Sequence, residues 1–351
     1  MIPGFKARYH PAPGIMKSRT IKKRTFKMRY FITGCTGFIG IHLCRLLFSK
    51  GHEVYGLVRN PQKIPPDLEG KLQVIQGDLE IFQNSGIELP PVDVVIHLAG
   101  VISGRNSSEY HKINFEAVQH LLNVLNRQKW KPKRFVFASS LAAAGPNQNG
   151  SVSKETDEPH PIDPYGVAKL KAEQLLNVQP FPTTTFRPSL VLGPGDPAML
   201  ILYKMANFGF SMLPMGKPQI LSVVYVEDLT RAIWLMSLDN SENHRLYFVT
   251  SEVPVTNREL MQEIGRTLGK KVHIILLPKF VFTIAMYLST AAAFLFRMRN
   301  QFDRKQYKQM TAPSFFCTSD LLTTETNWSA LTGPSDAVRM SVDGYRKLGW
   351  L

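Results

Sequence analysis

Two side chains near the middle of the chain could together move a proton to or from a carbonyl or an alcohol. Tyr165 and Lys169 stand four residues apart in the run PYGVAKLKAE, so at the start of a helix both would project from one face. A phenol with a pKa near 10 is a poor acid–base catalyst at neutral pH, but a nearby ammonium group lowers that pKa. Such a tyrosine can protonate a carbonyl oxygen as a hydride arrives, or deprotonate an alcohol. The spacing occurs once here, and chance alone could produce it, so its weight depends on its surroundings.

A glycine turn earlier in the chain could hold the diphosphate of a dinucleotide. The run TGCTGFIG places Gly34, Gly37 and Gly40 at three-residue steps between an apolar strand pattern at 28–33 and an apolar helical pattern at 38–48. At such a turn, missing side chains let backbone N–H groups close on a phosphate. The spacing differs from the G-x-G-x-x-G fingerprint, so a plain tight turn is the alternative. The position between strand and helix favours dinucleotide binding.

The loop after a second predicted strand, 53–58, indicates which dinucleotide is bound. An acidic residue there would bind a ribose hydroxyl, whereas an arginine would meet a 2′-phosphate. The loop instead offers Arg59 and Lys63 and has no acid. A guanidinium group suits bidentate phosphate contact, and the lysine adds a second positive charge. We therefore predict NADP, with NAD as the alternative cofactor and a solvated basic loop as the structural alternative.

The elements that must position these groups alternate along the first half of the chain. Apolar strands separated by helices predict an α/β fold with a Rossmann-type, doubly wound parallel sheet, whose ligand crevice lies at the carboxyl ends of the strands. Predicted strands cover 28–33, 53–58, 71–75, 92–98, 133–138 and 183–186, and predicted helices cover 38–48, 106–128 and 165–178.

The second half of the chain predicts a smaller C-terminal lobe that binds substrate. Residues 188–218 are rich in Gly, Pro and Met and show little periodicity. A helix, a strand and a second helix are predicted after them, at 226–238, 245–250 and 256–268. The predicted parts are a dinucleotide-binding domain over 28–187 and a lobe over 188–351, of which about 222–251 returns to the sheet.

Taken in order, four motifs resemble the extended short-chain dehydrogenase/reductase family, also described as the NAD-dependent epimerase/dehydratase family. They are T-G-x-x-G-x-x-G from Thr33, the run HLAG at 97–100, the pair Ser139-Ser140, and Tyr165-x-x-x-Lys169. The resemblance extends from about Met28 to the C-terminus, and the order of the motifs is far more specific than any one motif. It implies hydride transfer involving a nicotinamide dinucleotide.

The resemblance also implies roles for individual residues. Tyr165 would be the acid–base, Lys169 would bind the nicotinamide ribose and tune the phenol, and Ser140 would hydrogen-bond the developing oxyanion. Asn114 would hold a proton-relay water, and Asp78 would contact adenine. Structural alternatives are a cap for Ser140 and Asp78, and a surface helix position for Asn114. The predicted cofactor contacts are Gly34, Thr36, Gly37, Phe38, Ile39, Gly40, Arg59, Lys63, Asp78, Leu79, Leu98, Ala99, Gly100, Tyr165, Lys169 and Pro188.

Two runs in the second half bear on the substrate. Nucleotide-sugar members of the family carry an Asn and a Tyr after the sixth strand, and 186–195 (FRPSLVLGPG) lacks both. With SVVYVED at 222–228, it looks more like the 3β-hydroxysteroid dehydrogenase and dihydroflavonol reductase branch. The resemblance implies an NAD(P)-dependent oxidoreductase acting on a hydroxyl or ketone of a hydrophobic small molecule that is steroid-, terpenoid- or flavonoid-like. A nucleotide-sugar epimerase or dehydratase with tightly bound NAD is the alternative. A non-catalytic dinucleotide-binding protein is a lesser one, since it would not need the Tyr, Lys and Ser.

A long apolar stretch at 280–296 (FVFTIAMYLSTAAAFLF) has no charge over 17 residues and is flanked by Lys279, Arg297 and Arg299. It is at the short limit for a bilayer span. A buried or substrate-covering helix is the favoured interpretation, peripheral membrane contact through 280–296 is the second, and a span is the third. The first two suit a lipophilic substrate. A homodimer is left open.

Composition limits the remaining function classes. Hydrophobic residues make up 44% of the 351 and charged ones 20%, so a large core can form and wholesale disorder is excluded. The net charge is +15, but the basic leader at 1–27 holds eight Lys/Arg and no acid; without it, 34 basic residues face 27 acids, which leaves +7. We interpret the leader as a disordered tail or the result of a true start at Met28, with a targeting segment as the alternative, because it is basic and has no acid. We predict no nucleic-acid binding, because nothing there interleaves aromatics with base-reading residues. Cys35, Cys44 and Cys317 show no paired or metal-ligand spacing, which favours a reduced, cytoplasmic compartment, with membrane association left open, and no metal.

Overall fold

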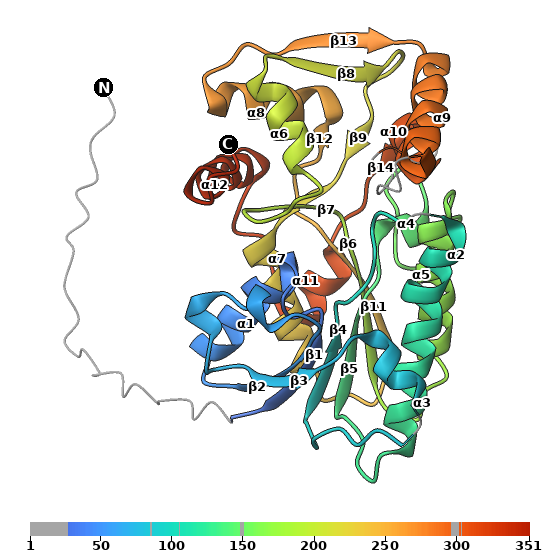
Figure 1. Cartoon of the computed structure of the whole chain (residues 1–351), viewed down its shortest axis with the longest axis vertical. Coiled ribbons are helices and arrows are strands. Elements are labelled where there is room, and N and C mark those ends of the chain that lie inside the picture. Colours follow the sequence, from blue (N-terminus) through green and yellow to red (C-terminus); the bar gives the residue numbers. More distant parts are fainter. Residues whose placement is uncertain (1–26, 85, 105, 148–150, 296–301, 303) are drawn as a thin grey trace, which may run out of the picture.

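The computed structural model describes residues 27–84, 86–104, 106–147, 151–295, 302 and 304–351. These residues form a seven-stranded sheet with the strand order β3-β2-β1-β4-β5-β6-β11 (Figure 1). The strands are β1 Arg29–Thr33, β2 Glu53–Val58, β3 Gln73–Gln76, β4 Val94–His97, β5 Arg134–Ala138, β6 Thr183–Pro188 and β11 Arg245–Val249. Each neighbouring pair is parallel, which confirms the predicted Rossmann-type fold class. The predicted leader, apart from Lys27, lies outside the described residues.

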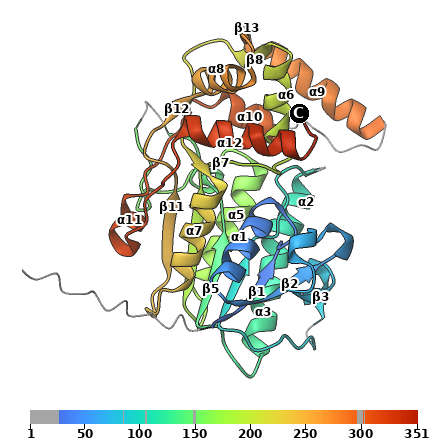
Figure 2. The same ribbon diagram turned by 90° about the vertical axis from the view of Figure 1, so that its left-hand side faces the viewer.

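Helices cover both faces of this sheet because its strands are apolar on both sides. On one face, α1 (Phe38–Ser49) and α7 (Val226–Ser237) pack over Tyr30 and Ile32 of β1. On the other face, α3 (Ala117–Arg127) and α5 (Pro164–Leu176) pack over Phe31. Figure 2 shows α1 and α7 together on one side of the sheet. Side chains that alternate along one buried strand therefore enter two separate cores.

The helix predicted over 106–128 is divided in the structure. It begins as α2 (Ser107–His111), with Asn106 capping its first turn by accepting a hydrogen bond from the Glu109 N–H. It then passes through a wide π turn at Lys112–Glu116 before α3 begins. Such a turn inserts a residue into the helical hydrogen-bond pattern and is frequent at functional sites. It places Asn114 on the side of the helix that faces the loop after β4.

The second half of the chain builds a lobe beyond the carboxyl ends of the sheet strands (Figure 1). Its core joins three helices, with Tyr203, Leu260, Ile264 and Val338 among the buried side chains. The helices are α6 (Leu200–Asn207), α8 (Asn257–Leu268) and α12 (Pro334–Lys347). Small sheets complete it, pairing β7 (Leu190–Leu192) with β10 (Val223–Tyr225), β8 (Phe210–Pro214) with β13 (His273–Leu277), and β9 (Ile220–Leu221) with β12 (Val255–Thr256) and β14 (Ser314–Phe315). The chain returns from this lobe to the Rossmann domain twice, first to add α7 and β11 and later at α11 (Asp320–Thr326), whose Leu322 joins the same core as α7.

The apolar stretch at 280–296 forms α9 (Lys279–Leu295), which packs against α10 (Arg304–Thr311). Phe282 and Met286 are buried, but Tyr287 and Leu288 are 66% and 65% exposed. Full burial, the first half of the favoured interpretation, is therefore wrong for one face of α9, and a substrate-covering role stays a prediction. Within the described residues, no helix is both long and apolar enough to cross a membrane.

Candidate active site

The glycine turn joins β1 to α1 at the carboxyl end of the sheet. Two of its glycines are required by the protein's own backbone, and the third faces open space. A Cβ at Gly40 would lie 2.1 Å from the Gly34 carbonyl oxygen, and one at Gly34, whose φ is +77°, would lie 2.7 Å from the Ala99 backbone nitrogen. Those two positions are glycine because the turn itself is tight. Gly37 is exposed, and a Cβ there would meet only the Gly34 oxygen, at 3.2 Å. Gly37 is therefore the position at which a ligand can approach the turn.

The start of α1 fits an anionic group. Gly37 is the N-cap, so no side chain occupies the first-turn amides, and the first turn contains no acidic residue. These N–H groups and the positive end of the helix dipole favour a phosphate. Thr36, Phe38 and Ile39, predicted as contacts, lie on this turn and are partly exposed. The residues present thus fit the diphosphate of a dinucleotide.

The remaining predicted cofactor contacts follow the ends of neighbouring strands. Leu98, Ala99 and Gly100 come directly after β4, and Pro188 is the last residue of β6. The loop after β4 borders the glycine turn, as the Gly34–Ala99 approach shows. Pro188 lies at the same end of the sheet, three strands away from β1.

The loop after β2 exposes Arg59 and Lys63, and among the described residues neither side chain pairs with an acid. Asp78, after β3, is exposed and accepts a hydrogen bond from the Glu80 N–H at 2.9 Å. It thereby caps the short helix at Leu79–Gln83, which is the structural alternative weighed for it. Its second carboxylate oxygen remains available, so contact with adenine stays a prediction. Arg59 and Lys63 are placed to meet a phosphate from solvent.

The predicted catalytic residues come together above the end of β5. Ser140 is the N-cap of α4 (Leu141–Ala144), where its oxygen accepts a hydrogen bond from the Ala142 N–H at 3.2 Å. Tyr165 lies in the first turn of α5, which begins where the Asp163 side chain caps the Gly166 N–H. The Ser140 hydroxyl lies close enough to the Tyr165 phenol to lower the pKa of the tyrosine. Ser140 therefore both caps a helix and contacts the tyrosine.

Burial dominates the acidity of the tyrosine. It raises the pKa of Tyr165 to about 12, while the Ser140 hydroxyl lowers that pKa and the charge of Asp163 raises it. The lowering predicted from Lys169 is not among the causes of this shift. At neutral pH the phenol therefore carries its proton and is a donor.

Lys169, one turn along α5, is held beneath the site rather than in solvent. Its ammonium group donates a hydrogen bond to the Ala138 carbonyl at 2.7 Å and lies 4.8 Å from the centre of the Phe137 ring. Burial lowers the pKa of Lys169 to about 8, and the nearby carboxylate of Glu173 opposes that shift. A buried lysine with this pKa exchanges its proton close to neutral pH.

Asn114 faces the same point from the π turn. Its amide oxygen accepts from the Val101 N–H and its amide nitrogen donates to the Val101 carbonyl, both at 3.0 Å. A Cβ on Gly100 would lie 2.6 Å from the Asn114 oxygen and 3.4 Å from the Lys169 nitrogen. Asn114 is fully buried, which rules out the surface alternative, and it anchors the loop after β4. Its role with a relay water stays a prediction.

Sequence reasoning missed several groups around the tyrosine. The ammonium group of Lys305, from α10, lies 4.6 Å from the centre of the Tyr165 ring and donates to the Ile102 carbonyl at 2.6 Å. Tyr110 packs edge-on against the Tyr165 ring at 6.0 Å. Lys305 is 140 residues downstream and belongs to no motif, so only the folded chain brings it here.

A buried ion pair joins α5 to β6. Glu173 accepts two hydrogen bonds from Arg187 of β6, at 2.9 and 2.6 Å, and one from the Ser139 hydroxyl. Both charged side chains are almost fully buried. His97, also buried, is held neutral because burial lowers its pKa to about 3. Arg187 thus pairs with Glu173 through Nε and Nη2, while its buried Nη1 has no hydrogen-bond partner among the described residues.

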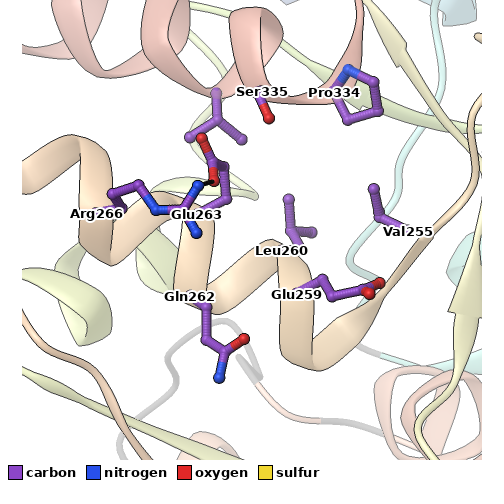
Figure 3. A pocket seen from close by; sticks show the side chains of 9 residues that line it. Val255, Glu259, Leu260, Gln262, Glu263, Arg266, Pro334 and Ser335 are labelled. Atoms are coloured by element: carbon purple, nitrogen blue, oxygen red, sulfur yellow. Dashed lines mark hydrogen bonds and ion pairs between the residues drawn. The ribbon is translucent and has the colours of Figure 1, made fainter.

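A separate pocket of about 180 Å³ lies between α8 and α12 in the lobe (Figure 3). Its charged side chains are already engaged: Glu259 caps α8 together with Thr256, and Glu263 pairs with Arg266 at 2.6 Å. The pocket contains none of the predicted site residues. This pocket is therefore separate from the candidate site at the carboxyl ends of the sheet strands.

Comparison with known proteins places the chain in a family. The model of the NAD dependent epimerase/dehydratase family matches residues 30–249, and the chain belongs to that family. A 4-hydroxy-2-methyl-3-oxo-4-farnesyl-3,4-dihydroquinoline-1-oxide ketoreductase of Stigmatella aurantiaca is 26% identical over 70% of this chain and 75% of its own length. A ceramide reductase of Caulobacter vibrioides is 23% identical over 91% of this chain and 95% of its own. The solved structure of UDP-glucose 4-epimerase from Thermotoga maritima with UDP-glucose superposes with a TM-score of 0.74 at 21% identity, covering 92% of this chain and 99% of that one.

Proposed function

We propose that the protein is an NADP(H)-dependent oxidoreductase that interconverts a ketone and a hydroxyl group on a hydrophobic small molecule. The observation that carries this proposal is the gathering of Tyr165, Ser140 and Lys169 at the strand ends that border the glycine turn. A protein that only senses a dinucleotide would need the turn but not those three side chains.

The bound dinucleotide supplies or accepts the hydride. The chain's own residues handle the proton: Tyr165 and Ser140 present two hydrogen-bond donors to a carbonyl oxygen and stabilise the charge that develops there. Because the pKa of Tyr165 is about 12, the phenol carries the proton that it can donate to the carbonyl oxygen at neutral pH. Lys169 lies below, where its positive charge stabilises the phenolate left behind.

Two observations support a hydrophobic substrate over a nucleotide sugar. The run 186–195 lacks the Asn and Tyr typical of nucleotide-sugar enzymes, and its Arg187 is sequestered by Glu173. The ketoreductase and the ceramide reductase are named for a farnesylated compound and for a ceramide, both largely apolar. The epimerase neighbour and the family keep a nucleotide-sugar epimerase with bound NAD as the second candidate.

The cofactor follows from the loop after β2. Arg59 and Lys63 are exposed, lack acidic partners among the described residues, and suit a 2′-phosphate. The buried free thiols of Cys35, Cys44 and Cys317 support a reducing, cytoplasmic setting.

The two candidate functions differ in net redox change. We expect consumption of NADPH, followed by absorbance, with apolar ketones such as sterol-like, terpenoid and flavonoid carbonyls, and no conversion of UDP-glucose. A purified protein that holds NAD through dialysis and converts UDP-glucose to UDP-galactose without net cofactor change would replace this proposal by the epimerase.

A further inference from the structure

The helix α9 has two apolar faces, and only one of them is covered. Phe282 and Met286 are buried toward α10, where the rings of Phe282 and Phe302 lie 6.4 Å apart and the Thr283 hydroxyl donates to the Tyr307 oxygen at 3.0 Å. α9 is thus fixed to the protein by its inner face. Its outer face needs a separate explanation.

The outer face is a continuous apolar stripe. At 100° per residue, the large exposed apolar side chains, together with Ala291, fall within about a 100° sector of the helix. They are Phe280, Ile284, Tyr287, Leu288, Ala291 and Leu295, and every one of them is classed as exposed. Five large apolar side chains that are more than half exposed on one helix exceed the scattered exposure that is normal at a protein surface.

The surroundings of the stripe are basic. Exposed basic side chains begin both helices, Lys279 in α9 and Arg304 in α10, which packs against α9. The described residues between 279 and 311 include no acid, and the one acid of that stretch of sequence, Asp303, lies outside them. A second copy packed on α9 by two-fold symmetry would bring these like charges toward their own counterparts. An anionic lipid surface complements both the charge and the apolar stripe.

The length of α9 fixes how it would lie. Its 17 residues rise about 25 Å, which is short of the hydrocarbon thickness of a bilayer. One side is also committed to α10. We propose that α9 lies in the plane of an anionic membrane, with the stripe buried among lipid acyl chains and the basic side chains at the headgroups.

This surface is connected to the catalytic tyrosine. The helix packed on the inner face of α9 is α10, whose Lys305 lies over the Tyr165 ring and bonds the loop at Ile102. Figure 2 shows α9 extending outward beside α10 at the end of the molecule where the lobe lies. If the proposed function holds, an apolar substrate would reach the site directly from the lipid phase. The membrane contact itself does not depend on that function.

The test is co-flotation of the full chain with vesicles of phosphatidylcholine and phosphatidylserine in equal amounts, and with vesicles of phosphatidylcholine alone. We expect flotation with the mixed vesicles, weakened by added salt. The double change Ile284→Glu with Leu288→Glu should lower the partition coefficient by about tenfold or more, since it sets two charges in the apolar stripe. The milder Tyr287→Ala should lower it by less.

The matched control is Val178→Glu with Leu331→Glu, which adds the same charges at two exposed apolar positions away from α9. It should float as the unmodified chain does, and thermal unfolding should be unchanged in all variants because every altered side chain is exposed. Failure of the unmodified chain to float, or equal loss in the control, would overturn the proposal. So would a dimer, seen by sedimentation, that the α9 double change dissociates, because a second copy would then occupy the stripe.

Discussion

Gly37 and Gly40 belong to one motif, yet the structure predicts opposite consequences for replacing each with alanine. In Gly40→Ala the new methyl group would lie 2.1 Å from the Gly34 oxygen and 2.7 Å from the Cys35 Cα. Both are backbone atoms that cannot turn aside, so the turn must open, and overpacking of this kind costs about 3 kcal/mol or more of unfolding free energy. In Gly37→Ala the nearest atom is 3.2 Å away and φ is −85°, which alanine adopts freely. The stability loss there is about 1 kcal/mol at most, from the poorer N-cap.

Although Gly37→Ala should hardly change stability, it should weaken the binding of the dinucleotide. The alanine methyl at position 37 projects into the open space in front of the first-turn amides, where a diphosphate must approach. We expect NADPH affinity, measured by calorimetry, to fall by about tenfold or more in a Gly37→Ala protein whose urea unfolding is nearly unchanged. The reasoning would be refuted if Gly37→Ala unfolded as easily as Gly40→Ala, or if it bound NADPH as tightly as the unmodified chain.

Three further predictions concern charged side chains around the site. Arg59→Asp should move the coenzyme preference from NADPH toward NADH, measured as the ratio of kcat/KM values, and an unmoved ratio would remove the argument for a 2′-phosphate. Burial lowers the pKa of Lys169 from 10.5 to about 8. Between these two pH values the unfolded chain keeps a proton on this lysine that the folded chain has released. The free energy of unfolding should therefore rise by about 3 kcal/mol as the pH increases through this window. Lys169→Met should flatten that rise in urea unfolding at pH 8 and pH 10; a parallel profile would contradict it. Lys305→Gln removes a cation that lies 4.6 Å from the Tyr165 ring centre, so the phenolate should form less readily and kcat for alcohol oxidation at a fixed alkaline pH should fall several-fold; an unchanged kcat would show that Lys305 only holds the loop at Ile102.

The strands of the Rossmann sheet were predictable because their residues are apolar on both faces. The strand at 53–58 matches β2 at both ends, and the strand predicted at 71–75 is displaced to Gln73–Gln76. The small sheets of the lobe were not predictable, since strands of two to five residues such as β9 carry too few positions to show a period.

The helix at 106–128 illustrates a different limit. A π turn adds one residue to a helical turn, so the apolar stripe continues with little change and the sequence does not reveal the break at Lys112–Glu116. Similarly, α9 is apolar around its whole circumference, and periodicity cannot say which face is covered. That choice depends on α10, which follows it in the chain but has no apolar pattern of its own.

The candidate site was predictable where chemistry requires a fixed spacing, as in Tyr165 and Lys169. The sequence could not show which glycines make room for a ligand and which make room for the protein's own backbone, because both needs are met by glycine. It also overestimated the effect of Lys169 on the phenol, because the burial that raises the pKa of Tyr165 comes from packing across distant segments.

The central claim is that the Tyr165 phenol is the proton donor beside a bound dinucleotide. The most direct measurement compares Tyr165→Phe with Tyr110→Phe, its buried aromatic neighbour at 6.0 Å, in turnover with NADPH and in calorimetric NADPH binding. We predict that Tyr165→Phe lowers kcat by about a hundredfold or more with NADPH affinity retained, and that Tyr110→Phe keeps most of the activity. Equal turnover by Tyr165→Phe and the unmodified chain, or no uptake of either coenzyme by the unmodified chain, would contradict the account.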